Sequence, residues 1–185
     1  EIAKICDHLS VNSNEVIQKG KYFYPRTNVA KPGPVAGPCL SKDTYILAES
    51  IQNKNLKSNL ISLTARKLNK DLPNYIIKKI IESDVLKKRK IKKICLFGIA
   101  FKGYPETDDT RNSSFYDFYD VLSRKYKKSK IFAFDPMIKK NFSYKKLYYR
   151  NNFKDSLKNS DLVFILNDHN FFKKLKKNDY EKFLK

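Results

Sequence analysis

The sequence of 185 residues contains no tryptophan, one methionine, five glycines and two histidines. No Cys-x-x-Cys pair occurs, and His8 and His169 lack the spacing of metal ligands, so we expect no zinc or other metal site. No apolar run approaches the roughly 20 residues of a membrane-spanning helix, so we expect no membrane contact. No Gly-x-Gly-x-x-Gly occurs, so the fingerprint of a dinucleotide-binding turn is lacking.

Basic residues greatly outnumber acidic ones, 39 to 19, which gives a formal charge of +20. Such a balance can indicate a nucleic acid or an anionic surface as the partner. Here the lysines and asparagines are spread over the whole chain, so we expect no specific nucleic-acid partner. The three cysteines are an odd and small number, which suits a reducing cytoplasm.

The first half of the chain has the apolar spacing of helices. We expect short helices over residues 1–9, with Cys6 in the core, and over about 13–20, opened by a cap at Asn12. Residues 43–70 are expected to form a helix, and Pro73 fits the first turn of a further helix over 74–86.

The second half has the pattern of a parallel α/β sheet. The run 87–93 is rich in lysine and is interpreted as a linker between domains. After it, expected strands at 94–99, 131–134 and 161–166 alternate with expected helices at 114–125 and 154–159.

The ligand crevice of such a sheet lies beyond the carboxyl ends of its strands. Lys102, Asp135 and Asp168 all fall just past such ends. Cys95 lies within the first strand and is expected to be buried and inert. Residues 139–152 have no clear period and are expected to form a loop or a weak element.

The stretch 31–43 holds three of the seven prolines and two of the five glycines, so we expect a rigid, kinked loop. It carries Cys39, followed by Lys42 and Asp43. A thiol must ionise to be a good nucleophile, and a nearby cation favours the ionised form. The residue types alone leave two interpretations open: a turn with a buried cysteine, or a nucleophile loop.

Two motifs distinguish these interpretations. Residues 32–43 read Pro-Gly-x-x-x-Gly-x-Cys-x-x-Lys-Asp, and residues 98–102 and 109–113 read Gly-x-x-Phe-Lys and Asp-x-Arg-x-Ser. These motifs, in this order, resemble the UDP-glucose/GDP-mannose dehydrogenase family of nucleotide-sugar dehydrogenases. Residues 24–29 and 167–169 look most like its UDP-N-acetylmannosamine dehydrogenase branch. The resemblance extends from Glu1 to about residue 172.

The resemblance implies an α/β architecture in which a helical segment precedes a Rossmann-like, doubly wound parallel sheet. It implies a central helical dimerisation domain over 1–86 that contains the nucleophile loop, the basic linker over 87–93, and a UDP-binding domain over 94–185. A homodimer would form through the central domain. The last strand of the UDP-binding domain would follow Lys185.

The same resemblance implies a role for individual residues. Cys39 would be the nucleophile, Lys42 would stabilise charge, and Asp43 would position a water. The implied substrate-binding residues are Arg26, Gly33, Gly37, Phe101 and Lys102, and the implied cofactor-binding residue is Arg111.

The implied reaction is the oxidation of a UDP-sugar primary alcohol to the uronic acid with two NAD⁺, through a thiohemiacetal and a thioester on Cys39. The sequence leaves the sugar open among UDP-N-acetylmannosamine, UDP-N-acetylglucosamine and UDP-glucose.

An N-terminal NAD-binding domain is expected to belong to the complete enzyme but is missing from this sequence, which begins with Glu1 rather than Met. We therefore expect this chain alone to be inactive. The alternatives are a truncated, inactive module that binds a nucleotide-sugar or dimerises, and a basic nucleic-acid binder.

Overall fold

The computed structural model describes residues 1–24, 26–83, 86, 89–138 and 141–181. The chain forms two compact units, Glu1–Pro34 and Val35–Lys185. Pro25 and part of the predicted linker at 87–93 lie outside the described residues, so the domain boundary expected there stays a prediction.

The first unit contains the two short helices that were predicted, α1 (Ile2–His8) and α2 (Ser13–Lys21). Helix α2 begins after Asn12, whose side-chain oxygen accepts hydrogen bonds from two backbone N–H groups of the first turn at 3.0 and 3.4 Å. This cap satisfies donors that have no partner within the helix. Cys6 is buried, as predicted.

The second unit begins with three helices, and here the sequence prediction was wrong. The expected helix over 43–70 is divided into α3 (Asp43–Glu49), α4 (Lys54–Ser58) and the first part of α5 (Ile61–Glu82). Asn53 explains one break, because its side-chain oxygen accepts two N–H groups of α4 at 3.0 Å each, which starts a new helix.

Helix α5 continues through Pro73, where the sequence predicted a new helix. Proline removes a backbone donor and crowds the preceding turn. Pro73 and Ile77 are nevertheless buried, and α5 packs along α7 (Ser114–Lys125), so tertiary packing outweighs the local preference. Within the part of the chain that the structure describes, no helix is both long enough and apolar enough to cross a membrane.

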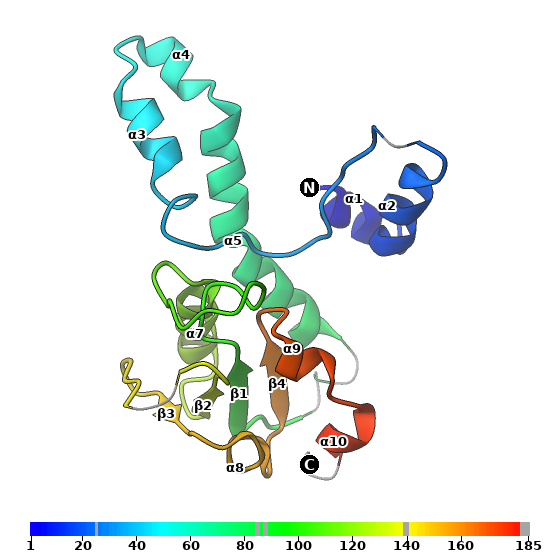
Figure 1. Cartoon of the computed structure of the whole chain (residues 1–185), viewed down its shortest axis with the longest axis vertical. Coiled ribbons are helices and arrows are strands. Elements are labelled where there is room, and N and C mark those ends of the chain that lie inside the picture. The colour runs from blue at the N-terminus through cyan, green and yellow to red at the C-terminus, as the bar shows by residue number, and fades with distance from the viewer. Residues whose placement is uncertain (25, 84–85, 87–88, 139–140, 182–185) are drawn as a thin grey trace. The chain divides into compact units, whose positions relative to one another are not determined.

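The sheet has four parallel strands in the order β3-β2-β1-β4 (Figure 1). Three of them, β1 (Lys93–Phe97), β2 (Lys130–Phe134) and β4 (Leu162–Ile165), match the predicted strands. The fourth, β3 (Tyr148–Tyr149), has two residues and lies in the stretch predicted as a loop or weak element. The predicted α/β fold with a parallel sheet is confirmed.

Side chains of β1 alternate between two cores, as the period of a strand requires. Ile94 and Leu96 enter the core formed with α7 and α5, whereas Cys95 and Phe97 enter the opposite core. That second core contains residues of α8 (Phe153–Leu157) and α9 (Asn170–Lys173), and α10 (Lys177–Glu181) follows them in the chain. Helices therefore cover both faces of the sheet.

Cys95 supplies a test of this packing. Its thiol is fully buried, donates to the Ser156 carbonyl at 2.8 Å and lies 2.9 Å from the Ser160 hydroxyl oxygen. Burial raises the pKa of the Cys95 thiol to about 11. The unfolded thiol ionises near a pKa of about 8.5, so this contribution to stability is complete below that pH and is lost as the pH rises toward the folded value.

We therefore expect the free energy of unfolding to fall by about 2 kcal/mol more in the parent than in Cys95→Ser between about pH 8 and about pH 10.5. Serine keeps a hydrogen-bonding group at this position but does not ionise in that range. Urea titrations of both proteins measure the difference. An identical pH dependence in the two proteins would contradict the assignment.

Candidate functional site

The loop that carries Cys39 is tied to two other parts of its unit. Val35 donates its N–H to the Asn69 side-chain oxygen at 2.7 Å and accepts from the Asn69 amide at 2.8 Å, which fixes the loop to α5. Gly37 donates its N–H to the Asn112 carbonyl at 3.1 Å, which fixes it to the loop before α7. The loop is therefore held on both sides immediately before the thiol.

Cys39 lies in the turn that leads into α3, and its free thiol is exposed. Its carbonyl accepts the N–H groups of Lys42 and Asp43 at 3.0 Å each. The Lys42 ammonium lies 2.7 Å from the Asp43 carboxylate. The Asp43 hydrogen bond raises the pKa of Lys42, and the charge of an ionised Cys39 adds to that effect. The three residues predicted as catalytic thus share one exposed turn.

Gly37 is the tightest point of the loop. Its φ is +111°, in the region that favours glycine, and a Cβ atom there would meet the Phe101 ring at 2.9 Å. Only a residue without a side chain lets the backbone of the Cys39 loop lie against Phe101. This contact joins the first predicted motif to the second.

The turn after β1 holds Phe101 and is itself held by a buried carboxylate. Asp135, which follows β2 and is 2% exposed, accepts the N–H groups of Ile99 and Ala100 at 2.7 and 2.9 Å. Its other oxygen accepts the N–H of Met137 at 2.8 Å. The Asp135 that the sequence placed past a strand end therefore has a structural role at the site.

Lys102 comes next along this turn and is half-buried. Its ammonium lies 5.3 Å from the centroid of the Phe101 ring. Among the acidic residues that the structure describes, none forms an ion pair with Lys102. The ammonium is therefore available to an anionic group of a ligand.

Arg111 is held by Asp109 in a two-pronged ion pair. Its Nε lies 3.0 and 3.1 Å from the two carboxylate oxygens, and its Nη2 lies 2.7 Å from one of them. The hydrogen bond from Arg111 lowers the pKa of Asp109, and that from Asp109 raises the pKa of Arg111. The charge of an ionised Cys39 also raises the pKa of Arg111, as the smallest of the effects on that group.

The loop after β4 closes over the turn after β1. The Asn167 amide donates to the Ala100 carbonyl at 3.2 Å and packs on Gly98, where a Cβ would lie 2.7 Å from it. A Cβ on Gly103 would lie 2.0 Å from the His169 nitrogen, so the two backbones touch there. This contact explains the glycine that follows Lys102.

His169 is buried in this contact, and its ring has a defined orientation. Its Nδ1 accepts the N–H of Phe171 at 2.9 Å, and its Nε2 faces the Glu106 carboxylate at 3.4 Å. Neighbouring Asp168 binds the Lys173 ammonium at 3.1 Å, and that hydrogen bond lowers the pKa of the carboxyl. The Asn-Asp-His motif thus fixes the loops around Lys102.

The predicted site residues divide between the two units. Arg26 and Gly33 belong to the first unit, and their roles stay predictions. The others lie in the second unit, where contacts and charge interactions link Gly37, Cys39, Lys42, Asp43, Phe101, Lys102 and Arg111. Their chemical roles also stay predictions.

Sequence reasoning did not assign a role to Asp109, Asn112 or His169. The role of Asp109 could have been recognised from the sequence, because an acidic residue two positions before an arginine can pair with that arginine. Asp109 also stands in the quoted Asp-x-Arg motif. Asn112 contributes through its backbone carbonyl, and His169 through a partner 63 positions away, Glu106, so neither contact is visible in the sequence.

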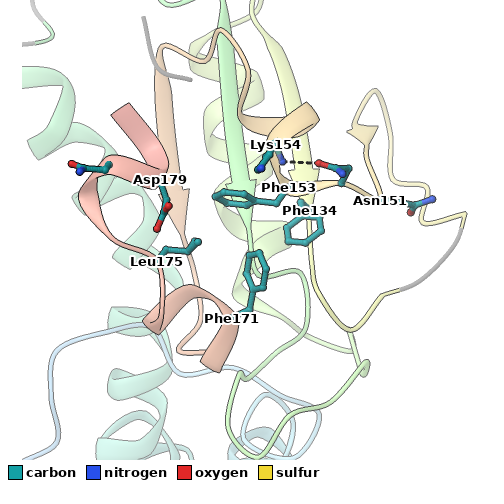
Figure 2. Close-up of a pocket in the computed structure, with 9 residues that line it drawn as sticks. Phe134, Asn151, Phe153, Lys154, Phe171, Leu175 and Asp179 are labelled. Atoms are coloured by element: carbon teal, nitrogen blue, oxygen red, sulfur yellow. Dashed lines mark hydrogen bonds between the residues drawn. The ribbon is translucent and has the colours of Figure 1, made fainter. Parts of the chain in front are cut away.

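A separate pocket of about 610 Å³ lies beside the aromatic core that contains Cys95 and Phe97. Figure 2 shows the rings of Phe134, Phe153 and Phe171 gathered there, with Lys154 and Asp179 at the side. No residue predicted as catalytic, substrate-binding or cofactor-binding is among the described residues that line it.

Comparisons with known proteins agree with both motifs. The family model described as "UDP-glucose/GDP-mannose dehydrogenase family, central domain" matches residues 1–71, and that family's "UDP binding domain" matches residues 95–185. The UDP-N-acetyl-D-mannosamine dehydrogenase of Methanococcus vannielii is 34% identical over 189 residues, which cover 100% of this chain and 40% of that protein.

Two solved structures extend the similarity to the fold. The UDP-N-acetyl-mannosamine dehydrogenase Cap5O from S. aureus is 28% identical with a TM-score of 0.76, over 98% of this chain and 40% of that one. An NDP-N-acetyl-D-galactosaminuronic acid dehydrogenase from Methanosarcina mazei Go1 has the same fold, with a TM-score of 0.82 at 22% identity, over 98% of this chain and 39% of that one. The chain spans about 40% of the length of its curated relatives.

The contact at Gly37 gives a prediction for the loop. We expect Gly37→Ala to lower the free energy of unfolding by about 1–3 kcal/mol, because the new Cβ meets the Phe101 ring and the positive φ becomes strained. Urea unfolding measures the loss. The matched control is Gly33→Ala, where no atom lies within 4 Å of the new Cβ and no positive φ occurs. Equal stability of the two variants would refute the proposed packing.

Proposed function

Because this chain belongs to the UDP-glucose/GDP-mannose dehydrogenase family, we propose that it is part of an NAD-dependent UDP-sugar 6-dehydrogenase. The proposed reaction oxidises a UDP-hexose to its UDP-uronic acid. UDP-N-acetylmannosamine is the favoured substrate, since the relative from M. vannielii and the structure from S. aureus both carry that name. UDP-N-acetylglucosamine and UDP-glucose are the other candidates.

One observation carries this proposal: the exposed Cys39 thiol stands in a loop that packs against the Phe101-Lys102 turn and is hydrogen-bonded through Gly37 to Asn112, the residue after Arg111. An exposed thiol with cations nearby suits a nucleophile. A free ammonium on the adjoining turn suits a diphosphate. We propose that a nucleotide-sugar extends between these two features, with its phosphates at Lys102 and its reacting carbon at Cys39.

In the proposed reaction the Cys39 thiolate adds to the aldehyde made by the first oxidation. A C–S bond forms and the carbonyl π pair moves to the oxygen, which then takes a proton from water to give a thiohemiacetal. After the second oxidation the same carbon is a thioester, and water hydrolyses it to the acid and the free thiol. Asp43 positions that water and Lys42 stabilises the charge that develops.

NAD⁺ would accept the hydride in each oxidation. Among the predicted residues, Arg111 is the one assigned to it. Asp109 occupies its Nε and Nη2, and the arginine side chain is 74% exposed, so the rest of the guanidinium fits one contact to a pyrophosphate. The remainder of a dinucleotide site would come from the NAD-binding domain that we propose as a partner of this chain.

The substrate is proposed to bind through the residues that the family motifs match. Lys102 would hold the diphosphate, and Phe101 and Gly37 would shape the passage to Cys39. The family motifs also imply substrate-binding roles for Gly33 and for Arg26, the latter on the nucleotide-sugar of the neighbouring subunit in the proposed dimer. We place this chemistry in the cytoplasm, within nucleotide-sugar metabolism that supplies polysaccharide biosynthesis. The three free cysteines support a reducing compartment.

Ligand binding tests the proposal on this chain. We expect UDP to bind measurably by calorimetry and NAD⁺ not to bind, because Lys102 offers a charge for a diphosphate and the sequence has no glycine-rich dinucleotide turn. Lys102→Ala should weaken UDP binding about tenfold, and added salt should weaken it in the parent. Lys127→Ala, at an exposed position after α7, is the control and should bind as the parent does.

The catalytic half of the proposal is tested in the complete protein. Cys39→Ser should abolish formation of the uronic acid and leave UDP-sugar binding intact, since the thiol acts on the carbonyl and not on the nucleotide. Binding without any turnover in the unsubstituted complete protein would favour an inactive binding module. For this chain alone, tight NAD⁺ binding without UDP binding would mean that the second domain is misassigned.

A homodimer through the helices α3 to α5 is the proposed assembly. Large apolar side chains are exposed there, including Ile46 at 61% and Ile61 at 85%, and a symmetric interface would bury them. We expect sedimentation at micromolar concentration to show a dimer that Ile46→Glu disrupts. Tyr148→Glu, on β3 and outside the predicted dimerisation domain, is the control. A monomer in the parent protein would contradict this proposal.

A further inference from the structure

We propose that Arg111 stabilises the anion formed at Cys39, and that Asp109 is the positioning residue that holds the guanidinium there. This role rests on the proposed function only in taking Cys39 as a nucleophile. It is additional to the cofactor contact that the family motif implies for Arg111.

The backbone keeps the two segments together. Gly37, two residues before Cys39, donates its N–H to the carbonyl of Asn112, the residue after Arg111, at 3.1 Å. Asn112 has a φ of +50°, so the chain turns sharply there before α7 begins. Because Gly37 is also packed on Phe101, the Cys39 loop cannot move away from the Arg111 turn without losing both contacts.

Asp109 is fixed more firmly than the arginine that it holds. Its side chain is 22% exposed against 74% for Arg111, and its carbonyl accepts the N–H of Phe101 at 3.0 Å. Its carboxylate accepts both the side chain and the backbone N–H of Arg111, the latter at 2.9 Å. An exposed arginine loses rotamer freedom when it is held, and the fork geometry of this pair fixes the plane of the guanidinium.

Charged residues lie on the segments next to the Cys39 loop. The turn into α3 brings Lys42 with its partner Asp43, the loop before α7 brings Arg111 with Asp109, and the turn after β1 brings Lys102, whose charge reaches Asp109. An ionised Cys39 raises the pKa of Arg111 after the larger effects of Asp109. This effect agrees with the backbone hydrogen bond between Gly37 and Asn112, which places the segments that carry Cys39 and Arg111 side by side.

This arrangement suits both anions of the addition step, the thiolate that attacks and the alkoxide that forms. When the thiolate adds to an aldehyde carbon, a C–S bond forms and the carbonyl π pair becomes a lone pair on oxygen. The single negative charge thus moves from sulfur to an oxygen that is bonded to the same carbon. The same cation can therefore stabilise the thiolate before the addition and the alkoxide after it. The step is reversible and needs no oxidant.

Two alkylating reagents of different charge test the proposal on this chain. The rate constants of Cys39 with anionic iodoacetate and neutral iodoacetamide are measured by mass spectrometry, and their ratio is taken. The ratio cancels changes in the amount of thiolate and in access to it, so it reports the local positive potential. A merely structural role for Arg111 would leave it unchanged.

We expect Arg111→Gln to lower this ratio about threefold at low salt, and Arg111→Lys to lower it less. The difference between parent and Arg111→Gln should shrink as salt is added. Lys42→Gln measures the share of the other nearby cation. The control with the same loss of charge is Arg150→Gln, since Arg150 packs on the Phe132 ring, and it should leave the ratio unchanged. An unchanged ratio in Arg111→Gln overturns the proposal.

A double-mutant cycle tests Asp109. In an Asp109→Asn background, Arg111→Gln should change the logarithm of the ratio by less than half as much, because an arginine that is not held spends its time in solvent. The Arg111 Nε–H signal in NMR spectra should exchange slowly in the parent and broaden in Asp109→Asn. An equal or larger effect of Arg111→Gln in that background refutes the positioning role.

The outcomes separate this inference from the proposed function. If the ratio responds as expected but Cys39→Ser leaves the complete enzyme active, the cation acts on a thiol that is not the nucleophile, and the proposed role of Cys39 in the reaction fails. If Cys39→Ser abolishes turnover and the ratio does not respond to Arg111, only the inference fails.

Discussion

The buried carboxylate of Asp135 is the constraint on which the site depends. It accepts three backbone N–H groups, two of them from the turn after β1. Hydrogen bonds to an ionised group contribute roughly 1.5–3 kcal/mol each, and a buried carboxylate without partners would be far more costly than an exposed one. These hydrogen bonds fix the turn, and the turn places Phe101.

Contacts of Phe101 in turn position the other residues of the site. Its N–H is bound by the Asp109 carbonyl, and its ring covers Gly37. Asp109 in turn holds Arg111, and Gly37 precedes Cys39 by two residues. The Asp135 carboxylate, which lies in another loop, thus fixes the position of the exposed turn that carries the Cys39 thiol. A nucleophile on the surface can be held rigidly in this way without being buried.

The sequence predicts the parts of this fold that depend on local pattern. The strands around Cys95 and the helix from residue 114 follow from apolar runs and helical spacing, and the structure contains them. The helix breaks do not follow in the same way: Asn53 competes as a cap within an otherwise helical pattern, and Pro73 continues a helix because packing against α7 outweighs its own preference. β3 has two residues, too few to give a period.

The site is predictable from the sequence only where a motif contains the residue. Cys39 and Arg111 stand in motifs, whereas the role of Asp135 depends on hydrogen bonds to residues 35 and 36 positions earlier. Whether residues so far apart in the sequence meet depends on which strands are neighbours in the sheet. Sequence reasoning could place Asp135 past a strand end but could not assign it to the turn that it holds.

Charge pairing near the thiol matters more than the large net charge of the chain. Each of the two cations that an ionised Cys39 influences already has a carboxylate partner, Asp43 for Lys42 and Asp109 for Arg111. Many of the other described cations are exposed, and salt screens exposed charges over about 10 Å. The field at Cys39 therefore depends on which member of each pair is nearer to the sulfur, and so on the geometry of the turns that hold them. A formal charge of +20 raises the local concentration of any anionic ligand, but it does not direct that ligand to one sulfur atom.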